Sequence, residues 1–578
     1  MTKNRVYEIV FLFLLGMSVA DPVYASPITV GTVEADPPTI HSLGIALPII
    51  NGDTNYNAQV LVWYRPQGSP QWQEGLPLLR VRPETLGTED PPENFGLPRP
   101  GEQFAGSLFD LVPDTAYNIR LDVQDPDGGN VTQTLTLRTR PVPTSAPATP
   151  HFVNVSTLSE FNTAVAAAQP GDVITLVNGT YNGPMSITRN GTAANPLFIR
   201  GESRDGVLIE ASGAHAGLVI SGAFVTVENL TVQGSAWGAI ITNSDHAVLR
   251  QLRFTNIFYG INAKGGTTTN SYICDNVLEG QGAIWPDTSS ATWDYEGIVM
   301  TGSGHVVCHN TLSGFGDALG LSWATDIPNR AIDFYGNDVL WTGDNALEFD
   351  FGERNIRAFR NRFTNAGNHA ISFQPVWGGP IYAIRNVIFN TASAPYKLNN
   401  DPSGFYIVHN TAIRSGWAWT QYGGYAANYQ FLNNLTIGTQ NAVDMSTQVL
   451  LGEINGNGWW PDGQFRFGTS WSSFNDLQHN SPYEQTGVLL TTPIFEQAVT
   501  LPSSHTTFMG PLTDVTLHST SNGLDAGMVL PNMNNHYQGQ GPDMGAQEKG
   551  QALPLYGVRS GTDTTPPAPP TGIQIQIL

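Results

Sequence analysis

The chain has 578 residues, with 26 basic against 48 acidic side chains and a formal net charge of −22. This excess of negative charge repels nucleic acid, so we expect no nucleic-acid partner. Two cysteines, Cys274 and Cys308, are too few for a disulfide-framework fold or a cysteine-ligated zinc cluster.

Residues 1–25 have the pattern of a secretory signal peptide. Lys3 and Arg5 precede the apolar run "IVFLFLLGMSVA", and Val23 and Ala25 stand at the small-residue positions of a cleavage site. We predict cleavage after Ala25 and secretion to the periplasm or the extracellular medium. No later run is apolar enough to span a bilayer, so we expect no membrane partner. We also expect a monomer.

Residues 26–140 read as short strands, because "AQVLVWYRP" and "YNIRLDVQD" alternate apolar and polar residues. The segment "LVPDTAYNIRLDV" resembles the corner of a fibronectin type III domain, through Leu111, Pro113, Thr115 and Tyr117. The resemblance implies a β-sandwich in which Tyr117 hydrogen-bonds to backbone. Residues 79–103 depart from it as a long, loop-like insertion. We favour a spacer or packing role over glycan binding. Residues 141–150 form a Pro/Ser/Thr linker.

An internal repeat follows the linker. The stretches "ICDNVL", "VCHNTL", "FYGNDV", "AFRNRF", "AIRNVI", "IVHNTA" and "FLNNLT" share an asparagine, with later spacings of about 24 residues. Such a period is typical of a solenoid with three short strands in each turn. We predict that the asparagines stack as a ladder that bonds to backbone, with Asn229 opening the series and Gln251 one turn later. The ladder residues are Asn276, Asn310, Asn337, Asn361, Asn386, Asn410 and Asn434.

This pattern resembles the right-handed parallel β-helix of the pectate-lyase-like superfamily. The opening, "FNTAVAAAQPGDVITLVNGTY" followed by "NPLFIRG", is similar to polysaccharide lyase family six, the alginate lyase and chondroitinase B group. The resemblance implies an all-β fold, with a β-helix over residues 151–550 behind the fibronectin type III-like sandwich. An amphipathic helix at 158–168 should cover its open end. Residues 525–548 resemble the last coil of secreted β-helix proteins, and 551–578 read as a tail or linker.

Cys274 and Cys308 precede successive ladder asparagines by two positions. Tyr335, Phe359 and Ile384 fill the same column in later turns, so we expect the column to point inward. Adjacent strands are close enough for a disulfide, and two buried free thiols fit the sequence equally well.

A second set of strands carries the candidate chemistry: "ALGLS" (318–322), "ALEFD" (346–350), "AISFQ" (370–374) and "PYKLN" (395–399). Their apolar residues alternate and should point inward, which turns Glu348, Asp350, Gln374 and Lys397 outward. Turns before these strands add further polar groups. They are Asp317, Asp344, Asn345, Asn368 and His369.

Aromatic residues surround this acidic strip. Those on or near an inserted loop and the following turns are Trp285, Trp293, Tyr295, Trp323, Trp341 and Trp377. Rings beside an acidic strip suit sugar stacking, although they equally suit packing of the loops onto the helix. Together with Gln374 and Lys397, they are the candidate substrate-binding residues.

The sequence favours a glycoside hydrolase that acts on a polysaccharide. Glu348 would be the proton donor, with Asp350 or Asp317 as its partner and with Asp344 and His369 nearby. The alternative is a polysaccharide lyase, since family-six lyases hold a calcium ion here, which Asp344, Glu348 and Asp350 would bind. The family's lysine is missing from "FDFGERN", leaving Arg354, Lys397 or His369 as substitutes. A third reading is a non-catalytic glycan-binding or adhesin-type β-helix. As a cofactor we expect at most one calcium ion.

Overall fold

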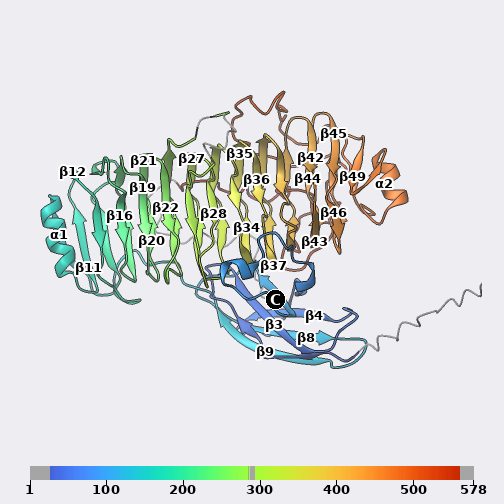
Figure 1. The fold of residues 1–578 in the computed structure, drawn as a ribbon, viewed down its shortest axis with the longest axis horizontal. Coiled ribbons are helices and arrows are strands. Elements are labelled where there is room, and N and C mark those ends of the chain that lie inside the picture. The colour runs from blue at the N-terminus through green and yellow to red at the C-terminus, as the bar shows by residue number, and fades with distance from the viewer. Residues whose placement is uncertain (1–25, 284, 287–292, 560–578) are drawn as a thin grey trace, which may run out of the picture.

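The computed structural model describes residues 26–283, 285, 286 and 293–559. The predicted signal peptide and residues 560–578 of the predicted tail lie outside the described residues. The chain builds two antiparallel sheets from its first part and a long stack of parallel coils from the rest (Figure 1). Among the described residues, no helix is both long and apolar enough to cross a membrane.

The N-terminal domain consists of a five-stranded and a four-stranded antiparallel sheet, an arrangement compatible with a sandwich. The hydroxyl of Tyr117 accepts a hydrogen bond from the backbone N–H of Val112 at 2.9 Å, as its motif predicts. The fibronectin type III assignment itself stays a prediction. The strands are β1 (Thr29–Val30), β2 (Glu34–Ala35), β3 (Leu43–Asn51), β6 (Leu79–Val81) and β7 (Gln103–Leu108) in one sheet, and β4 (Gln59–Pro66), β5 (Gln73–Gly75), β8 (Ala116–Gln124) and β9 (Val131–Arg138) in the other.

The predicted insertion after β6 holds two short 3₁₀ helices, η1 (Pro83–Thr85) and η2 (Pro92–Phe95). Gly96 ends η2 at φ +78°, a left-handed conformation that glycine adopts without steric cost.

The parallel β-helix has three long sheets, one for each strand of a coil. The fourteen-stranded sheet contains β10 (His151–Val155), β11 (Asp172–Leu176), β14 (Leu197–Gly201), β17 (Val225–Glu228), β20 (Val248–Arg250), β23 (Tyr272–Cys274), β26 (Val306–Cys308), β30 (Asp333–Tyr335), β34 (Ile356–Phe359), β37 (Trp377–Ile384), β40 (Ser403–Val408), β43 (Tyr425–Leu432), β46 (Gln448–Leu450) and β47 (Glu453–Asn455).

The thirteen-stranded sheet contains β12 (Gly179–Asn182), β15 (Val207–Glu210), β18 (Thr231–Gln233), β21 (Arg253–Ile257), β24 (Val277–Gly280), β27 (Thr311–Phe315), β31 (Asp338–Thr342), β35 (Arg362–Ala366), β38 (Val387–Thr391), β41 (Thr411–Ile413), β44 (Leu435–Ile437), β48 (Gly458–Trp460) and β51 (Val488–Leu489).

The nine-stranded sheet contains β13 (Met185–Ile187), β16 (Ala216–Ile220), β19 (Trp237–Ile241), β22 (Tyr259–Ala263), β25 (Ile298–Met300), β28 (Leu319–Leu321), β32 (Leu347–Glu348), β36 (His369–Ser372) and β39 (Ala394–Lys397). Smaller sheets pair β29 (Asn329–Arg330) with β33 (Gly352–Arg354), and join β42 (Trp417–Gln421), β45 (Asn441–Met445), β49 (Phe465–Phe467) and β50 (Thr469–Trp471).

A helix covers each end of the β-helix (Figure 1). Helix α1 (Leu158–Ala167) lies at the predicted place and buries Phe161 and Val165 on the first coils. Its N-terminal Thr157 side chain accepts from the Glu160 N–H, which satisfies one free donor of the first turn. At the opposite end, α2 (Phe474–Asn480) buries Phe474 and Leu477, and the sequence did not predict this helix.

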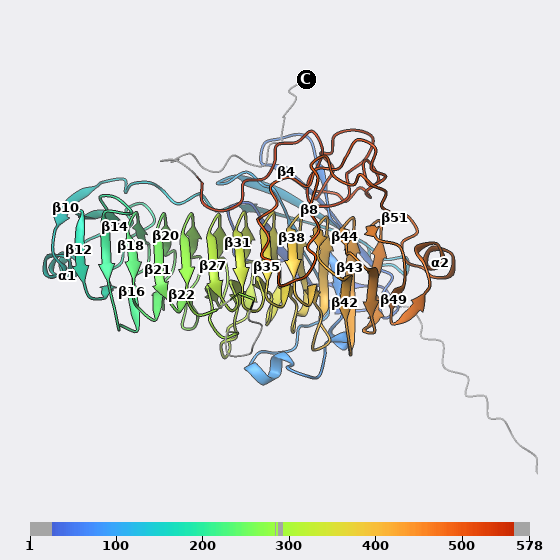
Figure 2. The same ribbon diagram turned by 90° about the horizontal axis from the view of Figure 1, so that it is seen from above.

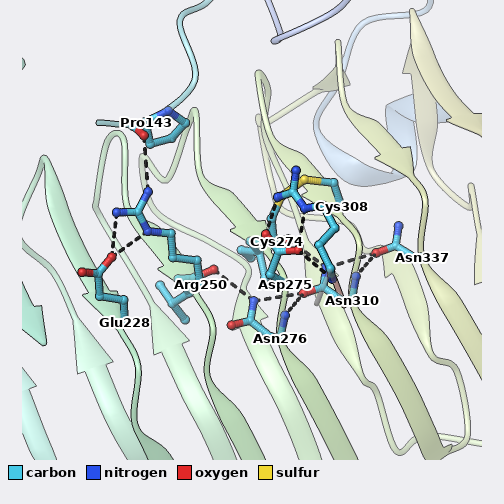
Figure 3. A network of polar contacts seen from close by, with 12 residues as sticks. Pro143, Glu228, Arg250, Cys274, Asp275, Asn276, Cys308, Asn310 and Asn337 are labelled. Atoms are coloured by element: carbon cyan, nitrogen blue, oxygen red, sulfur yellow. Dashed lines mark hydrogen bonds and ion pairs between the residues drawn. A yellow bond between two sulfur atoms is a disulfide. The ribbon is translucent and has the colours of Figure 1, made fainter. Parts of the chain in front are cut away.

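The asparagine ladder is present, and Figure 3 shows three of its members. Each amide donates to the side-chain oxygen of the next asparagine, as Asn310 does to Asn337 at 3.0 Å. The column continues beyond the prediction to Asn457 and ends on the carboxylate of Glu484.

The predicted start of the ladder was wrong by one position. Asn229 and Gln251 have φ of 61° and 56°, and they lie in a neighbouring column of left-handed residues that includes Asp275 and His309. Leu252 precedes Asn276 in the ladder column, and its N–H donates to the Asn276 side chain at 3.0 Å.

The cysteine column points outward, which corrects the prediction. Ile273 and Val307, the neighbours of the two cysteines, belong to the inner core, whereas Cys274 and Cys308 pack with Phe109 and Ile40 of the N-terminal domain. The column is buried because another domain covers it, so its apolar character does not reveal its direction. The two cysteines form a disulfide, drawn in yellow in Figure 3.

The N-terminal domain is docked on the β-helix through buried charges. Arg354 donates to Asp36 at 3.0 Å, and Asn355 donates to the same carboxylate at 2.7 Å. Arg360 pairs with Asp110 at 2.7 Å. The predicted linker also lies along the helix, since Arg250 donates to the Pro143 carbonyl (Figure 3). The domain is therefore a packing partner fixed in one position.

Residues 490–559 run back along the outside of the β-helix (Figure 2). Their apolar side chains pack on the outer face of the thirteen-stranded sheet, where Leu490 and Met544 meet Leu435 and Ile437. The segment bonds to Gly336, whose carbonyl accepts from the Gly557 N–H at 2.7 Å, and it reaches as far back as Asp275, whose carboxylate accepts from Arg559 Nε at 2.8 Å. The described residues after Leu489 add no paired strand to the β-helix sheets, so residues 525–548 are not its last coil.

Candidate functional site

The candidate site lies on the outer face of the nine-stranded sheet. The strand register places Gly320, Glu348, Ser372 and Lys397 side by side in successive coils. The residues flanking Glu348, Leu347 and Phe349, are fully buried in the core, so Glu348 points outward as predicted.

Asn345 joins two of the predicted acids. Its side-chain N–H₂ donates to Glu348 at 2.9 Å and to Asp317 at 3.2 Å, while its backbone N–H donates to Asp317 at 2.9 Å. Because the carboxylates of Asp317 and Glu348 both accept from the Asn345 N–H₂, the orientation of this amide is fixed and its oxygen points away from the two acids. Sequence analysis placed Asn345 among the turn residues and missed this bridging role.

Asp350 is held against the next coil. Its Oδ1 accepts from the Ser372 hydroxyl at 2.7 Å and from the Gln374 backbone N–H at 2.8 Å. Asp350 is 8% exposed, so this carboxylate is less accessible than that of the half-buried Glu348.

Burial raises the pKa of the clustered carboxyls. The pKa values of Glu348 and Asp317 lie well above their ordinary values, because both groups are desolvated and repelled by neighbouring acids. Burial also raises the pKa of Asp344, and it raises that of Asp350 to about 6. The Lys397 ammonium opposes the shift at all four carboxyls.

His369 lies at the start of β36 beside the acids. Burial, together with the nearby Lys397 and Arg414, lowers the pKa of His369 to about 3. The imidazole is therefore neutral near neutral pH. It can donate or accept a hydrogen bond there but does not supply positive charge.

The site offers oxygen atoms that lack partners. Asp344 Oδ1, Asn345 Oδ1 and Gln374 Oε1 are buried without a hydrogen-bond donor among the described residues. Buried acceptors are normally satisfied, so such oxygens suit a cation. Carboxylate and amide oxygens are also the ligands that Ca²⁺ prefers.

Within the described ranges, no three acidic, histidine or cysteine side chains form a preformed metal cage. In their chemistry, the unpartnered oxygens of Asp344, Asn345 and Gln374 suit a calcium ion, while Asn345 presents its N–H₂, not its oxygen, to Glu348. Asp350 fits this role less well than the sequence suggested, because its Oδ1 already accepts two hydrogen bonds.

Among the predicted aromatic residues, Trp377 does not meet the expectation. It is 3% exposed, and its Nε1 donates to the Asp90 carbonyl at 3.1 Å, so it holds the N-terminal domain and is too buried to stack on a sugar. Trp323 is 52% exposed beside the ring of Phe95. Phe95 comes from the loop-like insertion, and no signal in the sequence placed it here.

The remaining aromatic residues lie on the inserted loop and on β31. Trp285 packs edge-on against Phe508, and the ring of Tyr295 lies 5.5 Å from that of Tyr259. Trp293 is 38% exposed, and Trp341 lies half-buried on β31 of the thirteen-stranded sheet. Stacking on sugar stays a prediction for these residues.

Comparison with known proteins gives one curated relative. No family model matches the chain. Pectate lyase L of Dickeya chrysanthemi is 20% identical over 420 residues, which cover 67% of this chain and 85% of the relative.

Solved structures with similarity to the chain come from lyases and a hydrolase. An alginate lyase from Paenibacillus sp. str. FPU-7 has 15% identity and a TM-score of 0.24, covering 52% of this chain and 97% of its own. The PL6 family alginate lyase AlyGC has 14% identity and a TM-score of 0.31, and the match covers 53% of this chain and 51% of AlyGC. The catalytic domain of a GH87 alpha-1,3-glucanase in complex with nigerose has 12% identity and a TM-score of 0.20, and the match covers 74% of this chain and 95% of the glucanase domain. With its three parallel sheets of stacked coils, this protein has the pectate-lyase-like parallel β-helix fold.

Proposed function

We propose that this protein is a polysaccharide lyase, which cleaves a uronate-containing glycan by β-elimination on the outer face of the nine-stranded sheet. The observation that carries the proposal is the position of Lys397, which among the described residues is the one lysine in the strand column of Glu348. The lysine expected a few residues after Glu348 is absent from the sequence. In the fold, Lys397 lies in the same column, two coils after Glu348.

In this mechanism, Lys397 in its neutral form takes the proton from C5 of the uronate at its Nζ. The electron pair of that C–H bond forms the C4–C5 double bond, and the bond from C4 to the glycosidic oxygen breaks. The departing oxygen takes up a proton from solvent. General-base catalysis of this kind contributes typically about 10²–10⁴-fold.

In the proposed mechanism, the acidic residues neutralise the substrate carboxylate through a bound cation. Asp317, Asp344 and Glu348 would supply carboxylate oxygens to a calcium ion, which when bound would neutralise the uronate and make its C5 proton more acidic. Asn345 orients two of these acids through its amide. Asp350, fixed by Ser372, keeps the turn that follows β32 in place.

The relative named pectate lyase L supports the same reaction class. It is similar along most of its length, and its name describes elimination on a uronate polymer. Export of the mature chain as a monomer, as its first 25 residues suggest, is part of the proposal.

A glycoside hydrolase, which the sequence favoured, is the second candidate. The raised pKa of Glu348 favours it, because a carboxyl that keeps its proton to higher pH is better suited to act as general acid. The hydrolase reading assigns no role to Lys397.

Product chemistry separates the two. The protein is incubated with polygalacturonate, alginate and a neutral glucan in the presence of Ca²⁺. A lyase yields an unsaturated sugar that absorbs in the ultraviolet from a uronate polymer. New reducing ends without that absorbance would support the hydrolase and overturn the proposal.

A further inference from the structure

Four aromatic rings lie together next to Asp350, at one end of the row of acidic residues in the candidate site. Trp323 and Phe351 follow β28 and β32 of the nine-stranded sheet, and Trp377 begins β37 of the fourteen-stranded sheet. Phe95 of the N-terminal domain lies among them, with ring centroids 5.5, 5.1 and 5.5 Å from theirs. The cluster begins directly after the acids, because Phe351 is the residue that follows Asp350.

Polar contacts fix the Phe95 loop in this position. The Phe95 carbonyl accepts from the Asp326 N–H at 3.3 Å. Asp90 accepts from Trp377 through its carbonyl and from Asn400 through its carboxylate, at 3.1 and 2.9 Å. In Figures 1 and 2, the insertion, with its short blue helices, extends from the N-terminal domain to the flank of the β-helix.

Exposure differs sharply within the cluster. Trp377 is 3% exposed and Phe95 and Phe351 are half-buried, whereas Trp323 is 52% exposed. A tryptophan that is supported by a second ring and open to solvent offers a flat apolar surface beside polar groups. Sugar-binding sites commonly combine these two features.

We propose that Phe95 and Trp323 form a sugar-binding subsite that both domains build together, at the end of the strip marked by Asp350. Its ligand is a pyranose ring of the polysaccharide, distant from the bond that is cleaved. The inference rests on the proposed function for the identity of the polymer. It makes the N-terminal domain a part of the substrate-binding surface, through the insertion that departs from the fibronectin type III pattern.

The test compares variants for binding and cleavage separately. Affinity electrophoresis through gels that contain polygalacturonate or alginate measures binding without turnover. Trp323→Ala should weaken retention by the polymer roughly 10-fold, a typical effect of removing one well-packed aromatic contact. Trp323→Phe should keep most of it. Phe95→Ala should also weaken it, because Trp323 loses the ring that supports it.

Phe152→Ala is the matched control, since Phe152 is a 67% exposed aromatic residue on β10 at the far end of the β-helix. It should migrate as the unchanged protein does. Thermal melting verifies that Phe95→Ala remains folded. Equal migration of Trp323→Ala and the unchanged protein in every gel would overturn the subsite. The ultraviolet absorbance of products tests the lyase reaction independently, so either proposal can fail alone.

Discussion

Lys397 lies two coils beyond Glu348 in one column of the nine-stranded sheet, with Ser372 between them. Strands stack about 4.8 Å apart, which puts the Cα atoms of Lys397 and Glu348 roughly 10 Å from each other. The buried Ser372 adds little bulk between them. A lysine and an acidic cluster therefore face one outer surface of the sheet.

Lys397→Ala should reduce the formation of unsaturated product by roughly 10²–10⁴-fold. The side chain points away from the core, so its loss opens no internal cavity and the melting temperature should change little. Initial rates of ultraviolet absorbance measure the effect. Lys264→Ala is the control, because Lys264 pairs with Glu296 outside the column. Near-normal turnover by Lys397→Ala would exclude this lysine as the base.

Calcium should stabilise the protein, because it would bind buried oxygens that otherwise lack partners. Added Ca²⁺ should raise the melting temperature and a chelator should lower both it and activity. In Asp344→Asn and Glu348→Gln, both responses should be reduced, and Glu348→Gln should lose glycan cleavage. A melting temperature that is indifferent to Ca²⁺ and chelator would argue for acid–base chemistry without a metal.

The raised pKa of Asp350 predicts a pH dependence of stability. Its ordinary value is 3.8 and its folded value is about 6. Between these values the folded state holds a proton that the unfolded state has lost, so stability falls as the pH rises through this window. Asp350→Asn should therefore be relatively more stable than the unchanged protein at about pH 7, and this advantage should vanish below about pH 4. Melting curves across this range, without Ca²⁺, measure the difference. A constant difference at every pH would contradict the shift.

The ladder should be a main source of stability. Asn361 is fully buried, donates to the Phe334 carbonyl and to Asn386, and accepts from Asn337. Asn361→Ala leaves several buried groups unpaired, which should lower the free energy of unfolding by on the order of 4 kcal/mol. The exposed Asn182 is the control, and Asn182→Ala should change it by less than about 0.5 kcal/mol. Urea unfolding compares the two. Similar midpoints would show that the ladder adds little.

The β-helix was predictable from the sequence because the same side-chain contacts recur in successive coils. Each coil from Asn276 to Asn457 places an asparagine at one bend, and the regular period makes the stack visible in a single sequence. Period-two alternation likewise predicted that Glu348 points outward, since Leu347 and Phe349 must fill the core.

Contacts between distant segments were not predictable. Cys274 appeared to belong to the interior, because a column covered by another domain is as apolar as a core column. Nothing in the sequence links Phe95 to Trp323, more than two hundred positions later, since no period relates a loop of one domain to a turn of the other. Trp377 was misplaced for the same reason, as its partner Asp90 lies in that loop.

The most direct measurement of the central claim is the origin of the oxygen in the product. Polygalacturonate and alginate are cleaved in water enriched in a heavy oxygen isotope, and the masses of the products are measured by mass spectrometry. Elimination adds no water, so we predict an unsaturated product without the isotope, formed by the unchanged protein and not by Lys397→Ala. Products that carry one heavy oxygen and no double bond would show hydrolysis and contradict the account.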